Sequence, residues 1–151
     1  MAARQFCTFL VDGLYFGVEV QKVQEVIRFQ EMTRVPHSPT EVQGLINLRG
    51  QIVTAVDLRR RLQLEPRAED QRPMNVVIRT ADGATSLLVD EIGDVVGVGD
   101  ELFEPPPETL EGNARLLIRG TYKLDGRLLL ILDIDETIGI PTVAASDTEV
   151  A

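Results

Sequence analysis

The sequence predicts an all-β protein with short helices, arranged as two similar barrel-like lobes. Three observations lead to this fold class. Short apolar segments rich in β-branched residues are joined by Asp-Gly or Arg-Gly turns, there are few long helical patterns, and a polar segment from Glu65 to Pro73 divides the chain near its middle. Closed barrels would also hide the strand edges that otherwise promote aggregation.

The chain opens with a predicted β-hairpin. Phe6 to Val11 and Leu14 to Val18 are apolar at nearly every position and are joined by Asp12-Gly13, a favoured hairpin turn. Strands that are apolar on both faces are typical of strands buried on both sides or lying between two sheets. One of them could therefore cross over and complete the other lobe, and the sequence leaves open which.

The next segments change period. Val20 to Val26 is predicted to be one or two turns of amphipathic helix, because apolar residues recur there at helical spacing. The valine face would close one end of a barrel, while Val23 and Glu25, near the edge of that face, are candidates for contact with a partner. Phe29 to Val35 is predicted to be a strand, which Pro36 ends.

The most informative stretch runs from Gly44 to Arg59. Two apolar segments flank Arg49-Gly50 and predict a second hairpin, after which Asp57 caps a short helical turn. A type I′ turn would require a positive φ at Arg49, whereas a type II turn with Gly50 at its third position would avoid that strain. Either turn exposes the guanidinium, which could bind carboxylates or carbonyls of a partner or simply be solvated.

The second half of the chain repeats the first. An offset of 76 residues (120 − 44) aligns Gly44, Leu48, Gly50 and Asp57 with Gly120, Leu124, Gly126 and Asp133. The opening Asp-Gly pair recurs after 70 residues (82 − 12). We therefore expect an internal duplication, with lobes of roughly residues 5–72 and 73–140 and with strand exchange between them left open.

The repeat predicts the remaining elements. They are a hairpin of Asn75 to Thr80 and Ser86 to Val89, the segment Asp90 to Val96 in the place of Val20 to Val26, closing strands from Leu116 to Leu124 and from Arg127 to Leu132, and a final helical turn from Asp133 to Ile138. The last ten residues, 142–151, are small and acidic, and we expect them to be disordered.

Charge and composition exclude several classes of protein. The formal charge of −9 opposes binding to nucleic-acid phosphates and to anionic lipid surfaces. The longest apolar runs are far too short to span a membrane, and the N-terminus has no signal-peptide pattern, so we expect a cytoplasmic protein. Arg59 to Arg61 is expected to lie on the solvent face of its helical turn, with an arginine-binding partner as the alternative.

Residues for catalysis or metal binding do not form a recognisable pattern. No nucleophile elbow, Walker loop, zinc-protease motif or Cys-x-x-Cys pair is present. His37 is expected in a loop, and Cys7, the only cysteine, is expected in the core. We therefore expect no enzyme, no metal and no cofactor.

One motif points to a family. Gly44-Leu-Ile-Asn47-Leu-Arg49-Gly50, continued by Val56-Asp57-Leu-Arg59, resembles the signature of CheW, the coupling-protein family of bacterial chemotaxis. The resemblance implies a single CheW-like domain over residues 5–140, and we expect residues 141–151 to form a flexible acidic tail. This domain would consist of two SH3-like, five-stranded β-barrels with a groove between them.

The resemblance also implies partners. The groove would take the cytoplasmic hairpin tip of a chemoreceptor, and other surfaces would bind the regulatory domain of the histidine kinase CheA. Such a protein is a non-enzymatic scaffold in two-component signal transduction, cytoplasmic and attached to receptor arrays through its partners. The alternative function is a small β-barrel that binds a small ligand or an oligonucleotide, against which the acidic charge and scarce aromatic residues argue.

Candidate binding residues follow from the resemblance by position. The receptor- or kinase-binding set is Val23, Glu25, Gly44, Asn47, Arg49, Gly50, Val76 and Val95. The valines of this set would line the groove, Arg49 would supply polar contacts at its rim, and Asn47 and Gly50 would shape the turn that presents Arg49. The chain departs from the family at Thr54, where the family usually has proline.

Overall fold

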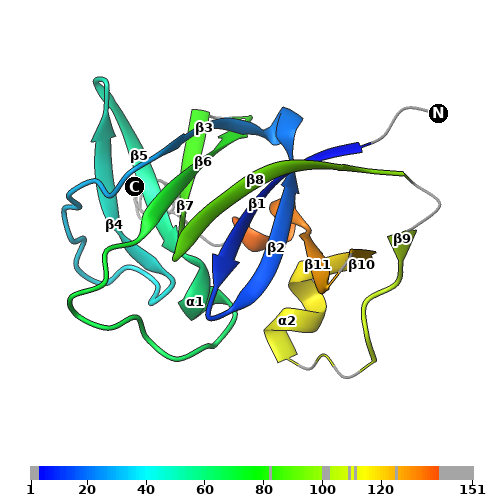
Figure 1. Cartoon of the computed structure of the whole chain (residues 1–151). Helices are drawn as coiled ribbons and strands as arrows, with labels where there is room; N and C mark the ends of the chain where they lie inside the picture. Colours follow the sequence, from blue (N-terminus) through cyan, green and yellow to red (C-terminus); the bar gives the residue numbers. More distant parts are fainter. Residues whose placement is uncertain are drawn as a thin grey trace.

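The protein is described by a computed structural model that covers residues 4–81, 83–99, 103–108, 110, 112–124 and 126–139 (Figure 1). Its strands are β1 (Arg4–Val11), β2 (Leu14–Glu19), β3 (Val23–Ile27), β4 (Val42–Leu48), β5 (Gln51–Asp57), β6 (Met74–Thr80), β7 (Gly83–Val89), β8 (Glu91–Val98), β9 (Phe103–Glu104), β10 (Ile118–Leu124) and β11 (Arg127–Leu132). Its helices are the 3-10 turn η1 (Val20–Lys22), α1 (Leu58–Arg61), α2 (Gly112–Leu117) and α3 (Ile134–Thr137). The predicted all-β fold class with short helices is confirmed. The acidic tail lies outside the described residues.

The strands form two mixed sheets that exchange hairpins. Sheet A has the order β8-β1-β2-β11-β10-β9, and sheet B has the order β3-β6-β7-β5-β4. The first hairpin, β1–β2, therefore completes the sheet of the second half, and β6–β7 completes the sheet of the first half. The exchanged hairpins join their hosts through the parallel pairs β2–β11 and β7–β5.

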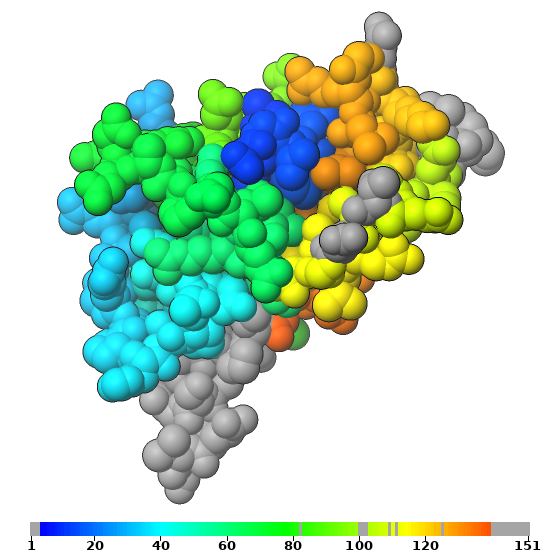
Figure 2. Space-filling view, turned by 90° about the horizontal axis from the view of Figure 1, so that it is seen from below, coloured from blue at the N-terminus to red at the C-terminus, as the bar shows by residue number. Residues whose placement is uncertain are grey.

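Because of this exchange, neither lobe coincides with residues 5–72 or 73–140. Figure 2 shows the consequence on the surface, where the blue first hairpin lies between the green segments and the orange closing strands. The register follows the predicted repeat. The β4–β5 pair has an irregularity after Val42 and the β10–β11 pair has one after Ile118, again 76 residues apart (118 − 42).

Three hydrophobic clusters explain why the exchanged strands are apolar on both faces. The largest joins the two sheets and includes Phe9 and Phe16 from sheet A with Val76 and Leu87 from sheet B. Two smaller clusters fill the lobes themselves, with Phe6 in the interior of the sheet A lobe. Alternate residues of one strand thus enter different cores, because side chains alternate across a strand. The predicted burial on both sides is confirmed.

Two predicted elements are wrong. Val20 to Val26 is not a helix but the η1 turn followed by β3, which pairs with β6. Phe29 to Val35 is not a strand, because only an isolated bridge between Thr33 and Leu45 forms there. Short apolar runs fit either period, and the β-branched side chains of β3 favour the strand once a neighbouring strand is available.

Gly44 and Gly120 allow the two lobes to close. Thr33 and Leu45 exchange two backbone hydrogen bonds of 2.8 Å beside Gly44, and Glu104 pairs with Thr121 beside Gly120. A Cβ on Gly44 would lie 2.7 Å from the carbonyl oxygen of Thr33, and one on Gly120 would lie 2.6 Å from that of Glu104. Each glycine is therefore required by the close approach of a crossing backbone.

We predict that Gly44→Ala lowers the free energy of unfolding by roughly 2 kcal/mol, because the backbone of Thr33 must move to admit a methyl group. Urea unfolding followed by circular dichroism measures this change. The matched control is Gln43→Ala on the same strand, whose effect should stay within about 0.5 kcal/mol. A Gly44→Ala protein as stable as wild type would contradict this role of the glycine.

Candidate functional site

The sequence allows two turn types, I′ and II, for the turn between β4 and β5. The turn adopts type I′, which strains the backbone at Arg49. Arg49 has φ +54° and Gly50 has φ +87°, the positive values of a type I′ turn. A residue other than glycine in this region costs about 1 to 2 kcal/mol. Asn47 stabilises the turn, because its Oδ1 accepts a hydrogen bond of 2.9 Å from the backbone N–H of Gly50.

Arg49 forms an ion pair with Glu25 across the gap between the two outermost strands of sheet B. One guanidinium nitrogen donates to Oε2 and the other lies near Oε1, each at 2.9 Å. The Arg49 side chain is 76% exposed, whereas Glu25, on β3, is only 17% exposed. The sequence singled out both residues but gave no sign of their pairing, because 24 residues separate them. We call this pair the rim pair.

The three valine positions of the predicted binding set differ in exposure. Val76 is only 1% exposed and packs in the cluster between the sheets, so its side chain lies in the core and not in a groove. Val23 is partly buried against the same cluster, whereas Val95, on β8, is 57% exposed. Gly44 is buried at the closure of the lobe, where it has a structural role.

Ile52 is an exposed residue that the sequence reasoning missed. It is 62% exposed and pairs with Asn47 across the β4–β5 ladder, next to the Arg49 turn. Its neighbour Val53 is fully buried. Because side chains alternate across a strand, an inward Val53 places Ile52 outward, and this alternation could have identified it.

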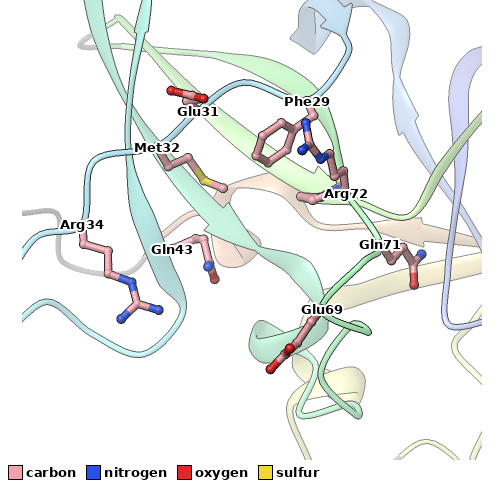
Figure 3. Close-up of a pocket in the computed structure, with 9 residues that line it drawn as sticks. Phe29, Glu31, Met32, Arg34, Gln43, Glu69, Gln71 and Arg72 are labelled. Atoms are coloured by element: carbon pink, nitrogen blue, oxygen red, sulfur yellow. The ribbon is translucent and has the colours of Figure 1, made fainter.

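A pocket of about 450 Å³ lies in the sheet B lobe, between the segment after β3 and the linker before β6 (Figure 3). Its charged lining residues are Glu31, Arg34, Glu69 and Arg72, two of each sign, and the Arg72 guanidinium lies 5.2 Å above the ring of Phe29. The balanced charges favour neither anions nor cations, and the predicted binding residues do not line this pocket.

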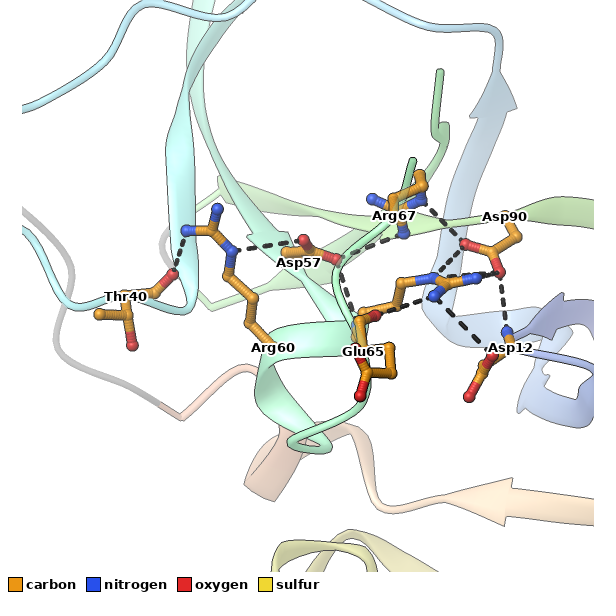
Figure 4. Close-up of polar contacts among 8 residues, drawn as sticks. Asp12, Thr40, Asp57, Arg60, Glu65, Arg67 and Asp90 are labelled. Carbon is orange, nitrogen blue, oxygen red and sulfur yellow. Dashed lines mark hydrogen bonds and ion pairs between the residues drawn. The ribbon is translucent and has the colours of Figure 1, made fainter. Parts of the chain in front are cut away.

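The sequence predicts that Arg59 to Arg61 lie on the solvent face of the helical turn α1. This expectation is wrong for Arg59 and Arg61. Arg59 is buried and donates to both carboxylate oxygens of Asp90 (Figure 4). Arg61 donates to the carbonyl oxygens of Thr137 and Glu136, at the end of α3. Only Arg60 is exposed, as expected. The predicted capping role of Asp57 is confirmed, since its side chain accepts from the N–H of Arg59.

Asp90 is held as an anion. Burial raises the pKa of its carboxyl group, but hydrogen bonds from Arg59, from the backbone N–H of Asp12 and from Arg67 outweigh burial and lower the pKa to about 2. The hydrogen bond with Asp90 in turn raises the pKa of Arg59. A carboxylate with so low a pKa is a poor proton donor or acceptor near neutral pH, so this cluster is structural in character.

The described residues contain no group of three or more side chains suited to hold a metal ion. His37 lies exposed in its predicted loop, with φ +63°. Burial raises the pKa of the Cys7 thiol. Within the described chain no helix is long and apolar enough to cross a membrane.

Comparison with known proteins decides the family. The model of the CheW-like domain matches residues 5–140. The chain belongs to the CheW-like family. A probable chemotaxis protein CheW of Rhizobium etli is 30% identical over 132 residues, covering 87% of this chain and 85% of that protein. The chemotaxis protein CheW of Bacillus subtilis is 31% identical over 130 residues, covering 86% and 83%.

A solved structure shows the same fold. The scaffolding protein TtCheW from Thermoanaerobacter tengcongensis matches this CheW-like chain with a TM-score of 0.81 at 23% identity, covering 91% of this chain and 94% of that one. The resemblance drawn from the turn motif is confirmed. The family and its chemotaxis relatives support a chemotaxis adaptor role for the chain, and they do not support the small-ligand or oligonucleotide alternative.

We predict a pH-dependent effect of Asp90→Asn. Because the folded pKa of about 2 lies below the ordinary 3.8, the stabilising contribution of Asp90 is complete well above pH 4 and is lost as the pH falls toward 2. At pH 7 the variant should be less stable than wild type by roughly 3 kcal/mol, since it leaves buried arginines without their anion.

The difference in the free energy of unfolding between wild type and Asp90→Asn should become smaller as the pH falls from 4 to 2. Urea unfolding at each pH measures this difference. Asp70→Asn, an exposed change in the linker, serves as the control and should match wild type throughout. A difference that does not vary with pH would show that the charge of Asp90 contributes nothing.

Proposed function

We propose that this CheW-like chain works in the cytoplasm as an adaptor that binds the hairpin tip of a chemoreceptor at the rim pair and binds the regulatory domain of the histidine kinase CheA at a second surface. The observation that carries the receptor site is the exposed, strained Arg49 held by Glu25. Strained backbone at an exposed position is typical of functional sites, because strain persists only where the surroundings enforce it.

The rim pair can bind a partner without being broken. A guanidinium has five N–H donors in a planar fork. Two nitrogens of Arg49 face the Glu25 carboxylate, which leaves the outward donors for carboxylates or carbonyls of a partner. Glu25 fixes the fork in place, so little side-chain entropy is lost when a partner binds.

Exposed aliphatic residues supply the apolar part of the proposed site. Ile52 stands beside the turn, and Val95 is exposed on β8 of the other sheet. A helical hairpin that contacts both would lie against the two lobes at once, as helices commonly bind apolar surfaces. Asn47 and Gly50 contribute by shaping the turn. Val23, which is partly buried, packs β3 against the cluster between the sheets.

Each such contact is modest, and function then depends on many of them. Receptors and kinases that each present several copies of a site raise the effective concentration of every further contact. An adaptor with weak individual contacts can therefore hold a stable assembly and still permit exchange of its members.

We predict that Arg49→Glu reduces recruitment of the kinase to receptor-bearing membranes about tenfold, since two carboxylates would then face each other at the rim. Co-sedimentation of the purified protein with membranes and kinase measures recruitment. Arg115→Glu, an exposed change on α2 at the far corner of the molecule in Figure 1, is the control and should retain wild-type recruitment.

The double variant Glu25→Arg with Arg49→Glu separates two roles. It restores an ion pair but reverses its polarity. If kinase recruitment stays low, a partner binds the guanidinium at the turn itself. If recruitment recovers fully, the ion pair only closes the lobe. A folded Arg49→Glu protein that recruits normally would remove Arg49 from the site.

A further inference from the structure

Four charged side chains are buried together where the chain passes from sheet B to sheet A. Asp57, Arg59, Arg67 and Asp90 have side chains that are between 6% and 10% exposed (Figure 4). Two carboxylates and two guanidiniums leave the group without net charge. We call these four residues the junction cluster.

Asp90 connects both sheets within this cluster. It stands between β7 of sheet B and β8 of sheet A. Its Oδ2 accepts a hydrogen bond of 2.6 Å from Arg59, next to β5 of sheet B, and one of 2.7 Å from the backbone N–H of Asp12, in the β1–β2 turn of sheet A. A single carboxylate group thereby joins the helical turn of one lobe to the hairpin turn of the other.

The linker between the halves is tied to the same point. Arg67 donates to Asp90 at 2.9 Å and to Asp57 at 3.3 Å, and Arg59 donates to the carbonyl oxygen of Glu65 at 2.8 Å. The start of the linker is thus fixed to the cluster by side-chain and backbone contacts together.

The repeat shows that the cluster occurs at only one of two equivalent places. The counterpart of Asp90 is Val20 (90 − 70), and the counterpart of Arg59 is Asp135 (59 + 76), which is exposed. An apolar valine and an exposed carboxylate cannot reproduce the fork. The charged fork therefore joins the two lobes at one of these two equivalent places, in addition to the hydrogen bonds from Arg61 to Thr137 and Glu136.

The cluster differs in kind from the apolar packing between the two sheets. Apolar packing holds two surfaces together but is not directional. Forked hydrogen bonds between arginine and carboxylate fix both distance and orientation. Burying charges adds little stability compared with apolar residues of the same volume, so the contribution of such a cluster is one of geometry.

We infer that the junction cluster is a clamp that fixes the angle between the two lobes, so that the chain, acting as the proposed adaptor, transmits orientation between its partners as a rigid unit. The clamp rests on contacts within the chain and does not depend on where a receptor or a kinase binds.

The test measures the distance between the lobes in solution. Spin labels are placed at Gln51 on sheet B and Lys123 on sheet A, both exposed, in the full chain with Cys7 replaced by alanine. Asp90→Asn is compared with Asp135→Asn, which removes the same charge from an exposed site. The clamp predicts that Asp90→Asn broadens the distance distribution about twofold, as expected for freed hinge motion, while Asp135→Asn leaves it unchanged.

A folded Asp90→Asn protein with the wild-type distribution would overturn the inference and leave the cluster a stabilising feature only. Should Asp90→Asn fail to fold, Arg59→Gln carries the test, because it removes the fork that joins Asp90 to α1 while Asp90 keeps its hydrogen bond from Asp12. A broader distribution of distances between the spin labels then supports the clamp, even if the broadening is less than twofold. An unchanged distribution contradicts it.

Discussion

The exchange of hairpins between the two halves is the constraint on which the rest of the structure depends. Neither sheet can be completed from its own half, because β1–β2 belongs to sheet A and β6–β7 to sheet B. Each exchanged hairpin has one face in the interior of a lobe and the other in the cluster between the sheets. Folding one lobe therefore requires the other, and the two form a cooperative unit.

The proposed site is a consequence of how the lobes close. The outermost strands of sheet B, β3 and β4, come together without a continuous ladder, and the gap is bridged by Thr33 with Leu45 and by the rim pair. A contact that closes a barrel is both exposed and rigidly supported, which suits recognition of a partner. The rim pair therefore combines an exposed guanidinium with a fixed support, as the proposed receptor site requires.

Local chemistry made much of the fold predictable. The Asp12-Gly13 and Arg49-Gly50 turns and the capping role of Asp57 depend on neighbouring residues, and the structure contains them. The predictions were wrong where the structure of a segment depends on a contact with residues far away in the sequence. The β3 segment becomes a strand because β6 lies beside it, and Arg59 is buried because Asp90, 31 residues later, receives it. Val76 likewise faces the core because the hairpin is exchanged, which the sequence left open.

Native-state hydrogen exchange in low concentrations of urea tests the central claim of one cooperative unit most directly. The exchanged hairpins predict that the most protected amides of β1 and β2 and those of β6 and β7 exchange through the same opening, with equal free energies and equal dependence on urea. Amides of one sheet that exchange at a lower free energy while the other sheet stays protected would contradict the account.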